Sequence, residues 1–131
     1  MGYCTRVTGE FTITPPLTWS EIKDSPYLDG DAHTGRLDVK LSIAEEQVDT
    51  KDGPLLRRSA AALVPAWDDS FKAYDLIDHV QDAIDSFPGH AFTGRLECEG
   101  EEAGDLWRVV IRDGRAVRIE PRIIWPEDGA E

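Results

Sequence analysis

The sequence has few cysteines and no long apolar run. Cys4 and Cys98 are the only cysteines among 131 residues, too few for the disulfide framework that staples a small secreted domain. No apolar run approaches the roughly 20 residues that a bilayer-spanning helix needs. The chain also does not begin with the basic and apolar segments of a secretory signal. We therefore expect a soluble, cytoplasmic protein whose two thiols are free.

Positive charge is also scarce. Fourteen Lys and Arg residues stand against 26 Asp and Glu residues, which gives a net charge of −12. Proteins that bind nucleic acid or anionic membranes usually present a basic surface to the phosphates. We therefore expect no nucleic-acid partner and no membrane partner, and a protein with a basic surface is the natural opposite. Acidity that serves solubility alone is the other interpretation.

The familiar motifs of enzymes and metal sites are missing as well. The sequence contains no Walker loop, no G-x-G-x-x-G and no G-x-S-x-G, which are the phosphate-binding and nucleophile motifs. Its three histidines are far apart and lack the spacing of zinc ligands. The acidic turns do not match the twelve-residue calcium loop. We predict no catalytic residue, metal or cofactor, and favour a non-enzymatic role while leaving an enzymatic one open.

One segment has the clear periodicity of an amphipathic helix, Asp68–Phe87. Asp68, Asp69 and Ser70 can accept hydrogen bonds from the free N–H groups of the first turn, and Pro88-Gly89 ends the pattern. Apolar residues recur at three- and four-residue spacing and predict a face that is buried against a sheet: Phe71, Tyr74, Ile77, Val80, Ile84 and Phe87.

Period-two alternation of apolar and polar residues predicts the strands. They cover residues 6–14, 36–48, 55–65, 92–98, 107–112 and 117–125. Tight turns between them imply antiparallel pairing. The predicted fold is therefore a single α+β domain over residues 1–131, with a twisted antiparallel sheet of about six strands in the order β-β-β-α-β-β-β and one main amphipathic helix on one face. We expect residues 127–131 to form a disordered tail.

Four details of this arrangement can be predicted from local patterns. Pro15-Pro16 should end the first strand, and Trp19–Ile22 can form one helical turn. In the last hairpin, a three-residue loop at Arg112-Asp113-Gly114 would pair Val109 with Val117 and keep apolar residues on one face. Both Trp107 and Trp125 are expected in the core.

The candidate binding residues come from the sheet face that points away from the helix and from two loop tryptophans. Acidic residues, among them Asp38, Glu97 and Glu99, are expected to alternate with arginines on that face. It is either a solvated surface with weak cross-strand ion pairs or a recognition surface or homodimer interface. The tryptophans can line a groove or cap the core. The candidates are Arg95, Arg108, Arg118, Arg122, Trp19 and Trp67.

Several motifs resemble those of a known group of proteins. They are the opening residues 1–9, Pro15-Pro16, the segments 19–23 and 104–108, and the closing residues 121–126. Together they resemble a family of small uncharacterised proteins, a domain of unknown function, from streptomycetes, other actinobacteria and their bacteriophages. The excess of Arg over Lys and the absence of Asn are compatible with a GC-rich source. The resemblance implies a phage or host accessory protein and supplies no catalytic residue.

Three functions are open on this sequence. The leading one is a non-enzymatic acidic protein that modulates a protein partner by binding it. The second is the binding or hydrolysis of a small nucleotide-like ligand, with arginines for phosphate and Trp19 or Trp67 for stacking. The third is a structural or assembly component. An acidic α+β domain can serve all three, because a fold does not determine a function.

Overall fold

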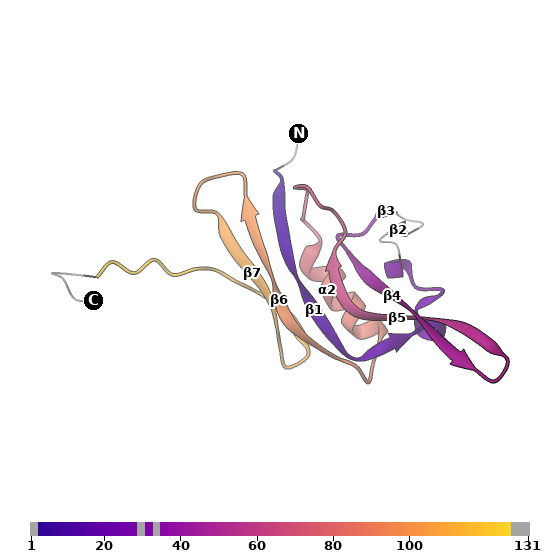
Figure 1. The fold of residues 1–131 in the computed structure, drawn as a ribbon. Helices are drawn as coiled ribbons and strands as arrows, with labels where there is room; N and C mark the ends of the chain where they lie inside the picture. Colours follow the sequence, from indigo (N-terminus) through magenta and orange to yellow (C-terminus); the bar gives the residue numbers. More distant parts are fainter. Residues whose placement is uncertain (1–2, 29–30, 33–34, 127–131) are drawn as a thin grey trace.

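A computed structural model describes residues 3–28, 31–32 and 35–126, and strands make up most of it (Figure 1). The elements in chain order are β1 (Thr5–Thr18), α1 (Trp19–Ile22), the 3-10 turn η1 (Pro26–Leu28), β2 (Asp31–Ala32), β3 (Gly35–Arg36), β4 (Val39–Thr50), β5 (Gly53–Pro65), α2 (Leu76–Ser86), β6 (Ala91–Gly100), β7 (Leu106–Arg112) and β8 (Arg115–Ile119). Six strands form one antiparallel sheet in the order β4-β5-β1-β6-β7-β8, and β2 pairs with β3 separately. The predicted α+β class is confirmed.

The core lies between the sheet and α2, which covers one sheet face (Figure 1). Alternate residues of β1 point to this face because side chains alternate along a strand, and they are buried: Val7, Phe11, Ile13 and Leu17. From the helix, Leu76, Val80 and Ala83 are buried. Burial of each large apolar side chain stabilises the fold by about 1.5–3 kcal/mol before entropy is subtracted.

The main helix begins later than the sequence pattern predicts. α2 starts at Leu76, so the predicted start at Asp68 is wrong, and its N-cap is Asp75. Residues 68–75 instead form a loop in which Phe71 pairs with Thr5 through two backbone hydrogen bonds of 2.7 and 3.0 Å. Tyr74, expected on the buried face, is 66 % exposed. Pairing with the start of β1 therefore prevails over the helical periodicity of this segment.

The first strand passes through its two prolines. The prediction that Pro15-Pro16 ends it is wrong, because β1 continues to Thr18. The pairing with β5 shifts register between Thr12 and Leu17, and proline lacks the N–H that a regular ladder would require. The predicted helical turn follows directly as α1.

The last hairpin has a two-residue loop, so the predicted three-residue loop is wrong. Arg112 pairs with Arg115 and Val109 pairs with Arg118. Asp113 and Gly114 both have positive φ, 53° and 76°, as in the two-residue turns that match the twist of a hairpin. The prediction assumed that only apolar residues share the face of Val109. Arg118, although charged, lies on that face.

The chain leaves the sheet after β8. The predicted strand to Trp125 is wrong: β8 ends at Ile119, and residues 120–126 extend away from the sheet (Figure 1). Trp125 is 82 % exposed rather than in the core, whereas Trp107 is buried as predicted. The expected disorder of residues 127–131 concerns residues outside the described part. Within residues 3–28, 31–32 and 35–126, no helix has the length and apolar character to cross a bilayer.

Candidate functional site

Two of the predicted arginines lie on the sheet face away from α2. Arg108 Nε is 2.7 Å from Glu97 Oε1, and Arg95 Nε is 4.0 Å from the same oxygen. Adjacent strands hold them there, because β6 pairs Glu97 directly with Arg108. All three side chains are about half-exposed, and such pairs contribute about 0–1 kcal/mol each. This part of the outer face has the arrangement of a solvated surface with cross-strand ion pairs.

The other two predicted arginines, Arg118 and Arg122, do not lie on the sheet face away from α2. Arg118 lies on the helix side of the sheet, where its guanidinium carbon is 4.2 Å from the centre of the Trp107 ring and its Nη2 is 3.2 Å from Glu120 Oε1. The placement of Arg118 on the outer face is therefore wrong, and the two-residue hairpin loop is the reason. Arg122 lies beyond the sheet, after β8. The four arginines do not form one surface.

The two tryptophans belong to different surroundings. The ring of Trp67 lies 6.4 Å from that of Phe71, in the loop that precedes α2. Trp19 is the first residue of α1, and the guanidinium carbon of Arg58 lies 5.3 Å from its ring centre. Of the six candidates, Trp19 is the one that lines the groove described below.

Asp38 is not on the outer face, where the alternation placed it. It precedes β4 and is buried, and its Oδ2 has no hydrogen-bond partner in the described part of the chain. Burial raises the pKa of this carboxyl group. The Asp38 backbone N–H donates to Nδ1 of His79 over 3.0 Å. The pair connects β4 to α2 and has a structural role.

The side chains of His90 and Cys98 are also engaged in structural contacts. His90 Nδ1 lies 2.6 Å from the Pro15 carbonyl and Nε2 lies 2.8 Å from Glu21, and both contacts raise the pKa of His90, the carbonyl the more. Burial raises the pKa of Cys98 to about 12, so it stays a thiol, as expected of a core cysteine. Among the described residues, no group of His, Cys, Asp and Glu could hold a metal ion.

The most distinctive surface is a long hairpin. β1 pairs with β5 as far as Thr18 opposite Ser59, whereas β5 continues to pair with β4 down to Gly53. Residues 44–58, the hairpin arm, therefore project from the sheet as a two-stranded ribbon (Figure 1). Its turn is closed by Thr50, whose hydroxyl donates to the Gly53 carbonyl over 2.6 Å.

The hairpin arm has an open edge and exposed apolar side chains. From Gly53 to Arg58, β5 pairs only with β4 within the described part of the chain, so alternate N–H and C=O groups face outward at that edge. Leu55 and Leu56 are 56 % and 55 % exposed. Because they are neighbours in a strand, they lie on opposite faces of the arm.

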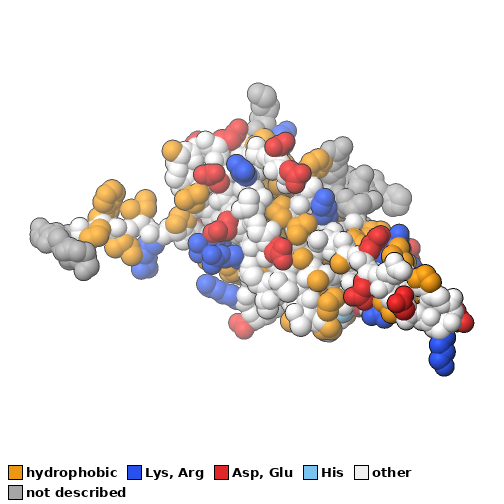
Figure 2. All heavy atoms as spheres, in the orientation of Figure 1, with side chains coloured by type: hydrophobic (Ala, Val, Ile, Leu, Met, Phe, Trp, Pro, Cys, Tyr) orange, Lys and Arg blue, Asp and Glu red, His pale blue; other side chains and the backbone are white. Residues whose placement is uncertain are grey.

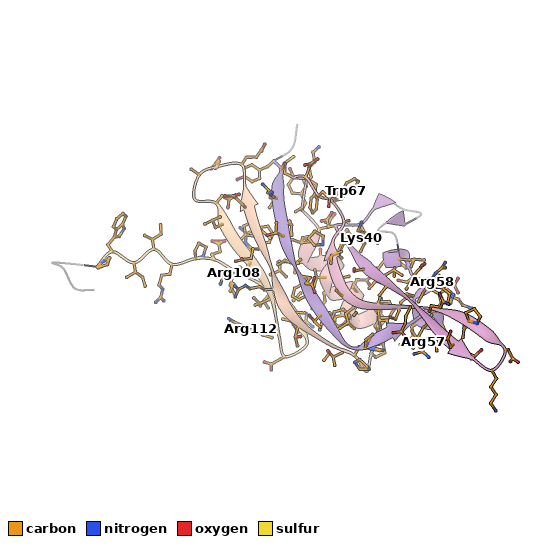
Figure 3. All side chains as sticks on the ribbon, viewed as in Figure 1. Lys40, Arg57, Arg58, Trp67, Arg108 and Arg112 are labelled. Atoms are coloured by element: carbon orange, nitrogen blue, oxygen red, sulfur yellow. The ribbon has the colours of Figure 1, made fainter. Side chains whose placement is uncertain are left out.

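A groove lies where β1 departs from β5. It has a volume of about 470 Å³ and its lining is mainly apolar. Two arginines also line it; Arg58 Nε is 2.8 Å from Glu45, and Arg57 is 3.9 Å from Glu46 (Figure 3). We call it the arm groove, and its lining is Pro16, Leu17, Thr18, Trp19 and residues 55–59.

Of the residues that line this groove, only Trp19 was among the candidates predicted from the sequence. The available signal was the doublet Leu55-Leu56, which places large apolar side chains on both faces of a strand that should have one buried face. That signal does not show that β1 ends its pairing at Ser59, so the open edge could not be predicted.

Comparison with known proteins gives one match. The model of a family described as "Family of unknown function (DUF6205)" matches residues 1–131. No curated protein and no solved structure matches the chain.

Proposed function

We propose that this chain, which belongs to the DUF6205 family, is a non-enzymatic protein-binding module whose arm groove receives an extended segment of a protein partner. The observation that carries the proposal is the open edge of β5 beside the exposed side chains of Leu55, Leu56 and Trp19. A peptide that adds a strand to such an edge gains main-chain hydrogen bonds, and the flanking side chains select its sequence.

The groove and the net charge together indicate the properties of the partner's bound segment and of its remaining surface. Its bound segment carries apolar side chains on both faces, because the arm does. Its remaining surface is basic, because a net charge of −12 attracts a positive surface and speeds the encounter. We place this interaction in the reducing cytoplasm of an actinobacterium or of one infected by a phage, where the protein modulates its target by occupying it.

The apolar contacts of the groove would not suffice for tight binding. Full burial of Leu55, Leu56 and Trp19 is worth about 1.5–3 kcal/mol for each side chain, and part of each is already covered. Association costs at least about 4 kcal/mol. The remainder must come from the partner's own apolar side chains and from the strand hydrogen bonds at the open edge. An isolated apolar ligand should therefore bind weakly.

The proposal is tested by capture with matched variants. Leu56→Glu introduces a charge in the arm groove, and Leu106→Glu introduces the same charge on β7, outside the groove. Both positions are about half-exposed, so both variants should fold, which circular dichroism checks. Tagged wild type and variants are incubated with actinobacterial lysate and washed at low and high salt.

We expect one stoichiometric, basic protein on the wild type and on Leu106→Glu, weakened at high salt and absent from Leu56→Glu. The purified partner should then bind with at least a tenfold weaker Kd to Leu56→Glu. Equal retention by all three proteins, or retention of a small molecule with no protein, contradicts the proposal.

A further inference from the structure

A second exposed apolar surface lies at the end of the molecule opposite the hairpin arm (Figure 1). After β8, residues 121–126, which we call the C-terminal segment, extend away from the sheet (Figure 1). Ile123, Ile124 and Trp125 are 77 %, 74 % and 82 % exposed, and Figure 2 shows hydrophobic side chains along this segment. Three consecutive large apolar side chains in solvent indicate an interaction site.

The C-terminal segment and the hairpin arm lie at opposite ends of the molecule (Figure 1). The segment leaves from β8, at one edge of the sheet, and the arm is formed by β4 and β5 at the other edge. A segment of six residues cannot cross the whole sheet, because a chain advances at most about 3.6 Å per residue. The segment can therefore meet an arm groove only on a second copy of the chain.

The apolar pattern of the segment matches that of the groove. In an extended chain, Ile123 and Trp125 lie on one face and Ile124 on the other. The hairpin arm likewise presents Leu56 on one face and Leu55 on the other. Pro121 and Pro126 enclose residues 122–125, and because proline has no N–H to donate, they bound a strand of four residues.

Local charge favours the same contact. The sequence continues after Pro126 with Glu127 and Asp128, and the groove is lined by Arg57 and Arg58. A guanidinium has five N–H donors and no acceptor, so each arginine can keep its contact with a glutamate and donate to a second carboxylate. Charge-assisted hydrogen bonds of this kind are stronger than neutral ones.

We propose that the C-terminal segment of one copy adds as a strand to the open edge of β5 in a second copy and fills its arm groove. This inference rests on the proposed function of the groove and adds a means of regulating it. The C-terminal segment of another copy competes for the groove, so a protein partner must displace that segment to bind. The contact is head-to-tail, so the copy that supplies the segment retains its own groove and the copy that supplies the groove retains its own segment for further contacts.

Light scattering after size exclusion tests this with the full chain. The variants are Trp125→Glu in the segment, Leu56→Glu in the groove and Leu106→Glu as the control with the same charge change. Wild type and Leu106→Glu should exceed the 14.6 kDa of one chain as concentration rises to about 1 mM. Trp125→Glu and Leu56→Glu should each stay at 14.6 kDa.

The decisive sample is an equal mixture of the last two variants. Trp125→Glu supplies an intact groove and Leu56→Glu an intact segment, so the mixture should give a species of twice the single-chain mass. A monomeric wild type overturns the inference, as does association that survives in both variants or a mixture that stays monomeric. In each of these cases, a partner captured by wild type and lost in Leu56→Glu would still support the proposed function.

Discussion

Asp38 combines an ionisable group with a buried position. Its carboxylate is close to the backbone of Asp75, the N-cap of α2, where the helix dipole favours negative charge. Burial nevertheless dominates and raises the pKa of Asp38, while His79 lowers it less. The folded state therefore holds the Asp38 proton more strongly than the unfolded state does.

Because the folded state holds the Asp38 proton more strongly, Asp38 makes the stability of the fold decrease as the pH rises. The contribution of Asp38 to stability is complete below the ordinary pKa of about 3.9 and is lost as the pH rises through the higher pKa of the folded state. At pH 7 the buried charge is a cost, because Oδ2 has no hydrogen-bond partner among the described residues.

We predict that Asp38 titrates above its ordinary pKa of about 3.9. The measurement is a carboxyl carbon NMR titration, with the Asp38 resonance assigned by its loss in Asp38→Asn. The amide cannot ionise, so this variant should also unfold at a higher urea concentration than wild type at pH 7. A titration midpoint at or below the ordinary value contradicts the account.

Among the elements, the β1–β6 pair depends on two glycines. The pair runs without a register shift from Thr5 opposite Gly100 to Thr14 opposite Ala91. Gly9 has φ 99° and Gly94 has φ 118°, which side-chain-bearing residues rarely adopt. A Cβ at Gly9 would be 2.6 Å from the Arg95 carbonyl oxygen, and one at Gly94 would be 2.6 Å from the Glu10 oxygen.

We predict that Gly9→Ala and Gly94→Ala each lower the free energy of unfolding by about 2 kcal/mol or more, because strained φ and a backbone clash act together. Gly53→Ala is the matched control. Gly53 also has a positive φ, 112°, but no atom lies within 4 Å of its added Cβ, so the cost should be about 1 kcal/mol. Urea unfolding measures all three, and equal costs would show that the close approach is unimportant.

Local patterns predicted the elements better than their ends. Alternation identified all six strands of the main sheet. The errors at Asp68, Pro15 and the last hairpin share one cause. In each, a pairing or packing contact outside the local pattern prevails: the pairing of Phe71 with Thr5, the pairing of Leu17 with Ala60 beyond the prolines, and the stacking of Arg118 on Trp107 of the adjacent strand.

At the scale of the whole molecule, the candidate site depends on where strands stop pairing. Ile123, Ile124 and Trp125 alternate well enough to suggest a buried strand, and Leu55 and Leu56 also belong to a strand pattern. Their exposure arises because β8 ends at Ile119 and β1 turns into α1 beside β5. How far one strand extends past the strand beside it depends on the tertiary structure. The apolar residues of the site could therefore be identified from the sequence, but their exposure to solvent could not.

Both proposed contacts, with a protein partner and with a second copy, require that the open edge of β5 accepts an added strand. Amide hydrogen exchange of residues 55–58, compared in wild type and Trp125→Glu at the same high protein concentration, tests it most directly, because amides at an open edge exchange with water and those in a strand pair are protected. We predict slower exchange in wild type than in Trp125→Glu, with the difference vanishing on dilution. Identical exchange rates in the two proteins at every concentration would contradict it.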